Sequence, residues 1–437
     1  MIRSFTSRID KPSALALALI AIWILALATG LSNPNGWITT ARGLPAQGDF
    51  LGIYAAGTLA ASGEPASAYD PTIQYATLQT LTDNRQVGNF PWVYPPTFLP
   101  IAAVLALLPF CASMAVWTIG TLAAFAAVLS RVTTSRRDLL LMLATPAPWL
   151  NFYIGQNGAL TGALMGSGLL LLAERPILAG LAFGLLSIKP HLGLLIPVAL
   201  LAGRYYRAFF SAAVTTIAFA LATLAAFGTV PWIAWPAQMS RVGPLVGMAS
   251  ETEKIQSLFG FARSLGIPSA GAMTLQAILT LSIAAVIAWL WRRRDVGLPL
   301  KCAALAAATT LASPYLFAYD LPVLTIAQAF FLRHLQLNEG TATKGEVYAL
   351  VLANVLVLAF ASFPPVPLAV CGSAIVLGVI LRRVLIEQRR ARKSLPQPKK
   401  CPAQPWRPHL APARLETFHD LKHDYVDGSL RNCVMSR

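Results

Sequence analysis

The sequence is poor in charged residues. Asp, Glu, Lys and Arg make up only 12% of its 437 residues, about half the roughly 25% that is usual in soluble domains. So little charge excludes an ordinary soluble fold. Three motifs are also absent from the sequence: the nucleotide loop Gly-x-x-x-x-Gly-Lys-Ser/Thr, the zinc helix His-Glu-x-x-His and the nucleophile elbow Gly-x-Ser-x-Gly. Their absence argues against ATP-driven transport and metalloprotease chemistry.

Cysteine is scarce too. The five cysteines have neither the spacing of metal ligands nor a pattern of pairs, so we expect free thiols and no metal site. The formal charge of +16 does not indicate nucleic acid, because the basic residues stand in short clusters between apolar runs and near the end of the chain. There they are expected to set the orientation of a membrane protein.

Long apolar runs dominate the sequence. Hydrophobic residues make up 56% of the chain, and its mean hydropathy is +0.60, which is typical of a protein whose solvent is the bilayer. We predict an all-α polytopic membrane protein of a bacterial-type inner (plasma) membrane. Arg3, Arg8 and Lys11 precede the apolar stretch Ser13–Leu31, which fits a signal peptide or an uncleaved first helix, and the many later runs favour the helix.

The basic clusters predict the sidedness of the spans. We interpret Pro96–Phe110, which has prolines at both ends, as an amphipathic helix at the outer interface, because the later basic clusters then all fall inside. The prediction is about 12 transmembrane helices, an outer loop over residues 32–110 and two cytoplasmic termini. After the first helix, spans are predicted at 111–130, 138–150, 157–173, 177–188, 191–203, 208–228, 273–291, 299–312, 320–332, 346–363 and 366–383.

Two predicted spans are too short to cross the membrane. The stretch between Arg175 and Arg204 cannot hold two crossings of about 20 residues each. We predict two half-helices that meet at Ile188–His191, or one bent span, and broken helices at membrane depth indicate a protein-enclosed cavity. Residues 1–383 would form the membrane domain, and the basic, proline-rich residues 384–437 a flexible cytoplasmic tail.

Polar motifs of unusual composition fall on the outer side of this topology. They are Gly48-Asp49-Phe50, Tyr94-Pro95-Pro96, Gly155-Gln156-Asn157, Lys189-Pro190-His191, Gln256-Ser257, Ser313-Pro314-Tyr315 and Tyr319-Asp320. A lysine inside an apolar run costs about 2.5–3.5 kcal/mol on insertion scales. We therefore expect these motifs to converge on one outward-facing cavity.

The residues leave several roles open. Asp49 and Asp320 each precede a predicted helix, so either carboxylate is a helix cap or a functional group. Lys189 either pairs with one of these two carboxylates or binds an anionic phosphate. His191 is a cation beside that phosphate, a proton carrier or a polar residue at the interface.

Several of these motifs, in their order and spacing, resemble glycosyltransferase family 87. The resemblance covers about residues 14–383 and rests on the segments 48–57, 63–71, 94–100, 155–157, 178–191 and 312–320. It implies a GT-C-type membrane glycosyltransferase, similar to mannosyltransferases that use polyprenyl-phosphate mannose. In such enzymes an acidic residue of the first outer loop is the general base, and here that position matches Asp49. Tyr315 departs from the polar His or Ser expected in some mannosyltransferase members, which bears on the sugar and the acceptor.

The implied reaction is an inverting transfer of a hexose, mannose above all, from polyprenyl phosphate to a lipid or glycan acceptor on the exoplasmic side. Asp49 would take the proton of the acceptor hydroxyl, and Lys189 with His191 would hold the departing phosphate. A monophosphate leaving group requires no metal cofactor. We expect the sugar and acceptor to be held by Tyr54, Tyr94, Gln156, Asn157, Gln256, Tyr315, Tyr319 and Asp320.

Two other functions fit a cavity with an intramembrane lysine. A transporter or lipid flippase would also use broken helices, and a catalytically inactive scaffold would keep the fold. The long outer loop favours the enzyme, since it carries Asp49 and offers a face for an acceptor that simple alternating access does not need.

Overall fold

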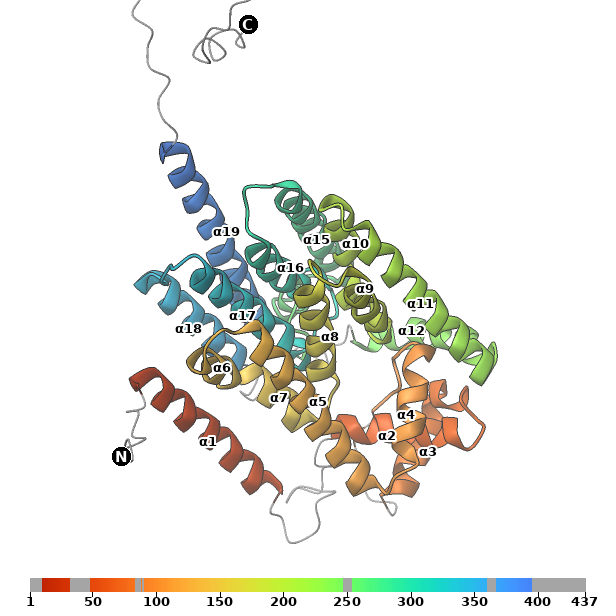
Figure 1. The fold of residues 1–437 in the computed structure, drawn as a ribbon. Helices are drawn as coiled ribbons and strands as arrows, with labels where there is room; N and C mark the ends of the chain where they lie inside the picture. Colours follow the sequence, from red (N-terminus) through yellow and green to blue (C-terminus); the bar gives the residue numbers. More distant parts are fainter. Residues whose placement is uncertain are drawn as a thin grey trace, which may run out of the picture. The chain divides into compact units, whose positions relative to one another are not determined.

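Helices account for the regular structure. The computed structural model describes residues 10–31, 48–82, 88, 90–246, 254–359 and 367–394. Among these residues every regular element is helical, and the one β contact is an isolated bridge between Ile255 and Phe317. The α-helices are α1 (Lys11–Leu31), α2 (Gly48–Ala61), α3 (Pro71–Leu81), α4 (Leu99–Ala106), α5 (Phe110–Val132), α6 (Arg136–Leu143), α7 (Pro146–Ile154), α8 (Gly158–Leu171), α9 (Pro176–Leu185), α10 (Ile196–Ala202), α11 (Tyr206–Phe227), α12 (Val230–Val246), α14 (Leu258–Ser264), α15 (Ser269–Arg292), α16 (Leu298–Ala312), α17 (Pro322–Leu337), α18 (Lys344–Leu358) and α19 (Ala369–Ser394) (Figure 1). The 3-10 helices are η1 (Ser67–Tyr69), η2 (Pro96–Phe98), η3 (Leu186–Ile188), η4 (Pro190–Gly193) and η5 (Ala318–Asp320).

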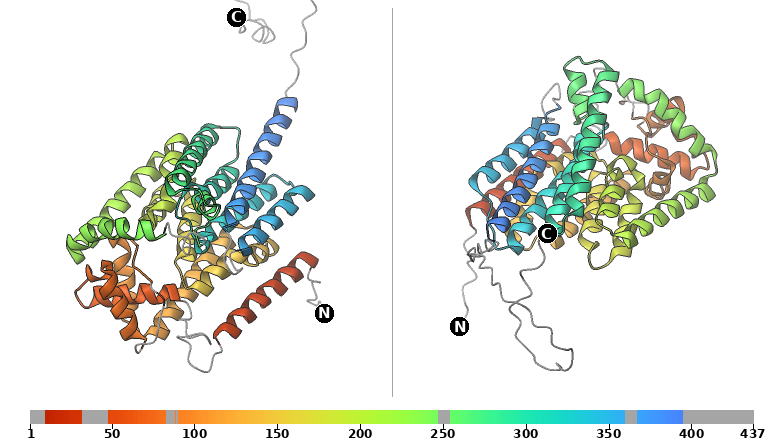
Figure 2. Two further views of the ribbon diagram at one scale, coloured as in Figure 1. Left: turned by 180° about the vertical axis from the view of Figure 1, so that it is seen from behind. Right: turned by 90° about the horizontal axis from the view of Figure 1, so that it is seen from above.

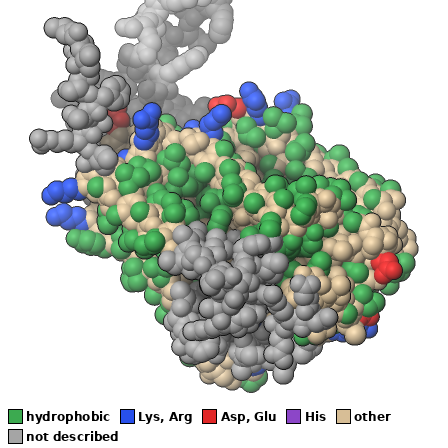
Figure 3. Space-filling model, turned by 90° about the horizontal axis from the view of Figure 1, so that it is seen from below, with side chains coloured by type: hydrophobic (Ala, Val, Ile, Leu, Met, Phe, Trp, Pro, Cys, Tyr) green, Lys and Arg blue, Asp and Glu red, His purple; other side chains and the backbone are tan. Residues whose placement is uncertain are grey.

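Four of the described helices are long and apolar enough to cross a bilayer. They are α5, α11, α15 and α19, and they correspond to the spans predicted at 111–130, 208–228, 273–291 and 366–383. Apolar side chains cover much of the surface in Figure 3, with Lys and Arg at its margins. The chain is thus an all-helical membrane protein, as predicted. The further crossings needed for about 12 spans remain a prediction, because the other apolar helices are shorter.

Helix α8 lies at the centre of the bundle. It packs against α5, α9 and α17, and a Cβ atom on Gly162 or Gly166 would approach Phe125 or Val128 to within 3 Å. The glycines that recur every four residues therefore form the close-packed helix face that their spacing predicts.

The chain breaks between α9 and α10 at Lys189. Helix α9 continues through η3 to Ile188, and η4 begins at Pro190. Lys189 itself has φ −145° and ψ 73°, because the residue before a proline is disfavoured from helical conformation. The predicted break between Arg175 and Arg204 is therefore seen at Lys189.

A compact outer group is formed by α2, α3 and α4 beside the start of α5 (Figures 1 and 2). Helix α2 lies so close to α4 that a Cβ atom on Gly57 would be 2.1 Å from the carbonyl oxygen of Ala102. The aromatic rings of Phe50, Trp92 and Phe98 fill the centre of this group and are fully buried. The segment predicted as an interfacial helix, Pro96–Phe110, is here η2 followed by α4, packed on α2.

The last helix runs beyond its predicted end. Helix α19 continues through residue 384, where the tail was predicted to start, to Ser394. The rest of the predicted tail lies outside the described residues.

Two arginine side chains tie helix ends together at one end of α17. Arg333 Nη1 donates hydrogen bonds of 2.9 Å to the carbonyl oxygens of Arg131 and Val132 at the end of α5. Arg383 of α19 forms a buried ion pair with Glu346 in the first turn of α18, with Nη2–Oε2 at 2.6 Å. These contacts satisfy carbonyl and carboxylate groups of neighbouring helix ends.

Candidate active site

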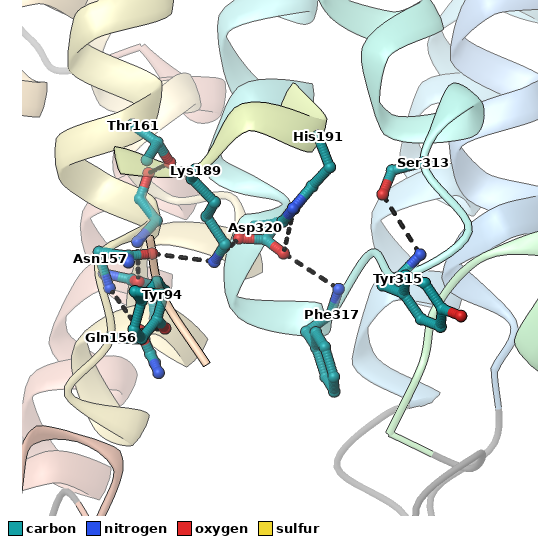
Figure 4. Close-up of polar contacts among 12 residues, drawn as sticks. Tyr94, Gln156, Asn157, Thr161, Lys189, His191, Ser313, Tyr315, Phe317 and Asp320 are labelled. Atoms are coloured by element: carbon teal, nitrogen blue, oxygen red, sulfur yellow. Dashed lines mark hydrogen bonds and ion pairs between the residues drawn. The ribbon is translucent and has the colours of Figure 1, made fainter. Parts of the chain in front are cut away.

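Helix breaks at the other end of α17 build a polar cluster. It consists of Asp49, Tyr94, Gln156, Asn157, Lys189, His191, Tyr319 and Asp320, and Figure 4 shows its central contacts. These residues come from the start of α2, the segment before η2, the α7–α8 connection, the η3–η4 break and η5. Five of the seven predicted motifs therefore meet in this cluster, whereas Gln256-Ser257 and Ser313-Pro314-Tyr315 lie outside it, and the outward-facing cavity stays a prediction.

The α7–α8 connection is shaped by two glycines. Gly155 ends α7 with φ +82°, the left-handed conformation that glycine adopts without strain. Gly158 begins α8 and lies against η5, where a Cβ atom would be 1.6 Å from the carbonyl oxygen of Tyr319. No other residue fits there, so this close approach brings Asn157 beside Asp320.

Lys189 is 3% exposed and forms an ion pair with Asp320. Its Nζ also donates to Asn157 Oδ1 at 2.9 Å and lies 4.5 Å from the centre of the Tyr319 ring, a cation–π distance. Of the partners left open by the sequence, Asp320 rather than Asp49 carries the ion pair. An ammonium group has three N–H bonds, and among the described residues these contacts use two as hydrogen bonds.

Asp320 is fully buried and bonded on both oxygens. Besides Lys189, its Oδ2 accepts the backbone N–H of Phe317 at 3.1 Å and lies 3.8 Å from His191 Nε2 (Figure 4). Phe317 lies upstream of Asp320, so these bonds close the turn of η5, and no side-chain cap is found at the start of α17.

Asp49 stands at the other side of the cluster. Helix α2 begins at Gly48, so Asp49 lies inside the first turn rather than at the capping position before it. Gln156 Nε2 donates to Asp49 Oδ2 at 3.2 Å, and Tyr94 Oη donates to Gln156 Oε1 at 2.7 Å. A continuous path of hydrogen bonds, which includes the backbone N–H of Asn157, therefore links Asp49 through the α7–α8 connection to Lys189.

Two buried donors in the cluster have no hydrogen-bond partner among the described residues. They are Asn157 Nδ2 and His191 Nε2. Because nearly all buried polar atoms in folded proteins are paired, Asn157 Nδ2 is a candidate donor to an oxygen-rich ligand, whereas His191 Nε2 already lies 3.8 Å from Asp320 Oδ2.

Three predicted site residues lie outside the polar cluster. Tyr54 donates its hydroxyl to the Leu108 carbonyl oxygen at 2.9 Å within the outer group. Gln256 is fully buried and accepts the Ala369 N–H at 3.2 Å. Tyr315 is 36% exposed and packs edge-on against Phe259. Their expected contacts with the sugar or acceptor stay predictions.

Sequence reasoning missed two supports of the cluster. Asn151 Oδ1 accepts the N–H of Gly158 at 2.7 Å, and Trp117 Nε1 donates to the carbonyl oxygen of Gly155 at 3.1 Å. An asparagine within the apolar segment Pro146–Ile154 was the available signal. Among the described residues no group of three or more His, Cys, Asp or Glu side chains could hold a metal ion.

The apolar helices and the polar cluster at the helix breaks define a helical membrane protein with a candidate site for a polar ligand. A model of glycosyltransferase family 87 matches residues 92–314, just over half of the chain. The chain belongs to glycosyltransferase family 87 and is a membrane glycosyltransferase, as its motifs predicted. The matched range includes Tyr94, Gln156 and Lys189, whereas Asp49 and Asp320 lie outside it. No curated protein and no solved structure matches the chain.

Proposed function

We propose that this chain is an inverting glycosyltransferase that moves a hexose, mannose above all, from polyprenyl phosphate to a lipid or glycan acceptor on the exoplasmic side. One observation carries the proposal. In a member of a glycosyltransferase family, a carboxylate, Asp49, is linked to a buried cation, Lys189, through Gln156 and Asn157, and Asn157 Nδ2 has no hydrogen-bond partner among the described residues. A glycosyl transfer from a phosphate needs a base at one side of the sugar and anion-binding groups at the other.

Asp49 is the proposed base. As the acceptor hydroxyl oxygen bonds to the anomeric carbon, its proton passes to the Asp49 carboxylate. The bond between the anomeric carbon and the phosphate oxygen breaks, and its electron pair leaves with the phosphate. Attack opposite the leaving group inverts the configuration. The carboxylate group returns its proton to solvent after the product leaves.

The leaving phosphate is proposed to lie between Lys189, Asn157 and His191. Asp320 balances the charge of Lys189, so the site binds the phosphate through directed donors: the remaining N–H of Lys189, Asn157 Nδ2 and His191 Nε2. Such donors act strongly in an enclosed site, because they are oriented before the charge develops. Tyr319, whose ring lies against Lys189, is proposed to contact the sugar.

The exoplasmic side is favoured by the basic residues. Helix α17 has 16 residues and spans about 24 Å, with Asp320 just before its start and Arg333 near its end. Arginine clusters of multi-pass proteins stay on the cytoplasmic side. The polar cluster at the opposite end of α17 would then face outward.

The test uses membranes containing the full-length protein and a panel of radiolabelled polyprenyl-phosphate hexoses. We expect transfer from the mannose donor, and a fall of about 10²–10⁴-fold in Asp49→Asn, the range for loss of a general base. Asp70→Asn is the matched control, because Asp70 caps α3 through the N–H groups of Thr72 and Ile73 and asparagine caps equally well.

Three results would contradict the proposal. Full activity of Asp49→Asn removes the base, and equal losses in both variants indicate a structural effect. If the wild-type protein transfers no sugar from any lipid donor, the proposed enzyme activity is refuted. Movement of lipid between the leaflets of vesicles containing the protein would in that case support a flippase.

A further inference from the structure

The side-chain amide of Gln156 has only one orientation that its neighbours allow. Its Oε1 atom accepts the backbone N–H of Asn157 at 3.0 Å and the hydroxyl of Tyr94 at 2.7 Å. A backbone N–H can only donate, so the amide atom that faces Asn157 must be the oxygen. The amide nitrogen then faces Asp49 Oδ2, at 3.2 Å.

This orientation makes Gln156 a donor to the carboxylate. A hydrogen bond from a neutral N–H favours the ionised form of the carboxylate that receives it, and it restricts the rotation of that side chain. Gln156 itself is 6% exposed. It lies between Gly155, which ends α7, and Gly158, which begins α8. The close approach of Gly158 to the Tyr319 carbonyl oxygen fixes the position of this connection, whereas Asp49 stands in the first turn of a separate helix, α2.

We infer that Gln156 is a positioning residue, whose amide, oriented by the backbone N–H of Asn157 and bonded to Tyr94, holds the Asp49 carboxylate ionised and directed toward the acceptor hydroxyl. The inference rests on the proposed role of Asp49 as the base. It assigns Gln156 to the carboxylate instead of to the sugar, where sequence reasoning had placed it. Gln156 exchanges no proton: the acceptor proton passes to Asp49, as in the proposed reaction.

Gln156→Glu is the most direct variant. It places a second carboxyl group 3.2 Å or so from Asp49, and two carboxylates at that distance share a proton. The acid limb of the pH–activity profile for transfer from polyprenyl-phosphate mannose should therefore move upward by about one pH unit or more. A profile at the wild-type position, measured on folded protein, would overturn the inference.

A matched control comes from another buried glutamine. Gln276 Oε1 accepts the Phe259 N–H, and its Nε2 donates to the Leu311 carbonyl oxygen, so it also bonds two helices but has no contact with the polar cluster. Gln276→Glu should reduce the yield of folded protein and leave the pH profile of the remainder unmoved. A shift as large as that of Gln156→Glu would show that the profile responds to any buried carboxyl group, and the inference would fall.

A second variant covers the case in which Gln156→Glu does not fold. Gln156→Met should lower kcat by about tenfold to a hundredfold, the worth of a hydrogen bond to a charged group, with the KM for the donor unchanged. In an Asp49→Asn background the same change should cost nothing further, because the two residues act as one unit. A multiplied loss in the double variant, or a change in KM alone, indicates a structural or substrate-binding role and overturns the inference.

These outcomes separate the inference from the proposed function. Undiminished transfer by Asp49→Asn removes the base itself. A different set of results would remove only the role of Gln156. In that case Asp49→Asn loses transfer, but the pH profile of Gln156→Glu is unmoved and the kcat of Gln156→Met is undiminished.

Discussion

Two buried ion pairs at opposite ends of α17 differ in how fully they are satisfied. Arg383 and Glu346 bond through both carboxylate oxygens, at 3.0 and 2.6 Å, and the arginine also donates to the Thr341 carbonyl oxygen. Glu346 in addition accepts the backbone N–H of Thr343 in a capping box. These contacts are local to one helix start and one neighbouring helix, so the pair fastens α18 to α19.

The pair of Lys189 and Asp320 has a different environment. Its neighbour Asn157 carries a buried donor without a hydrogen-bond partner among the described residues. Lys189 stands at a helix break, and Asp320 also accepts the Phe317 N–H at the start of η5 and lies 3.8 Å from His191 Nε2. A closed network indicates a structural role, whereas a buried network with spare donors indicates that a ligand completes it. The comparison therefore favours a structural role for the pair at one end of α17 and supports the proposed chemistry at the other.

The largest expected effect is on folding and concerns the ion pair of Arg383 and Glu346. Arg383→Met leaves the Glu346 carboxylate buried without its cation, which should lower the free energy of unfolding by about 3–5 kcal/mol, measured by chemical denaturation in detergent. The double variant Arg383→Met/Glu346→Gln should recover most of that loss. Transfer per folded molecule should match wild type in both, and a specific loss of transfer would break the comparison.

Neutralising the pair of Lys189 and Asp320 should lower transfer but leave the protein folded. Lys189→Met/Asp320→Asn removes both charges together, so no unpaired charge remains buried and the protein should fold. Its transfer rate should fall by about 10²–10³-fold, as when a preorganised donor to a developing anion is lost. A folded double variant with wild-type turnover would show that this pair, too, is only structural.

A smaller effect is expected from one of the spare donors. His191→Phe removes the Nε2 donor, and kcat/KM for the lipid donor should fall by about tenfold to a hundredfold, the worth of a hydrogen bond to a charged group. His191→Gln keeps an N–H donor at a similar reach and should retain more activity than the phenylalanine variant. Equal activity in the two variants would mean that His191 does not contact the phosphate.

The smallest effect is expected at the edge of the cluster. Tyr94→Phe keeps the ring contacts with Trp92 and Phe98 but removes the hydroxyl that donates to Gln156. Because the Asn157 N–H still orients the amide, turnover should fall by no more than about tenfold, the worth of one neutral hydrogen bond. Rates measured at a saturating concentration of the sugar donor test this prediction. A loss larger than that of Gln156→Met would contradict the inference that Tyr94 acts on Asp49 only through Gln156.

Sequence patterns predicted the helical class and the convergence of the cluster, since charge clusters and polar breaks in apolar runs define which ends meet. They left the partner of Lys189 open, because no sequence rule fixes the distance between side chains 131 positions apart, such as Lys189 and Asp320. Tyr54 and Gln256 bond to backbone groups of Leu108 and Ala369. Such partners carry no sequence signal, so those two residues looked as functional as Gln156.

The central claim is that the polar cluster binds the sugar phosphate with Asp49 on the far side of the anomeric carbon. An experimental structure with a non-transferable polyprenyl-phosphonate mannose bound tests it most directly. We predict the phosphonate within hydrogen-bond distance of Lys189 Nζ and Asn157 Nδ2, and the Asp49 carboxylate facing the opposite side of the sugar ring. A phosphonate bound at the Arg383 end of α17, or a sugar that does not lie between Lys189 and Asp49, would contradict it.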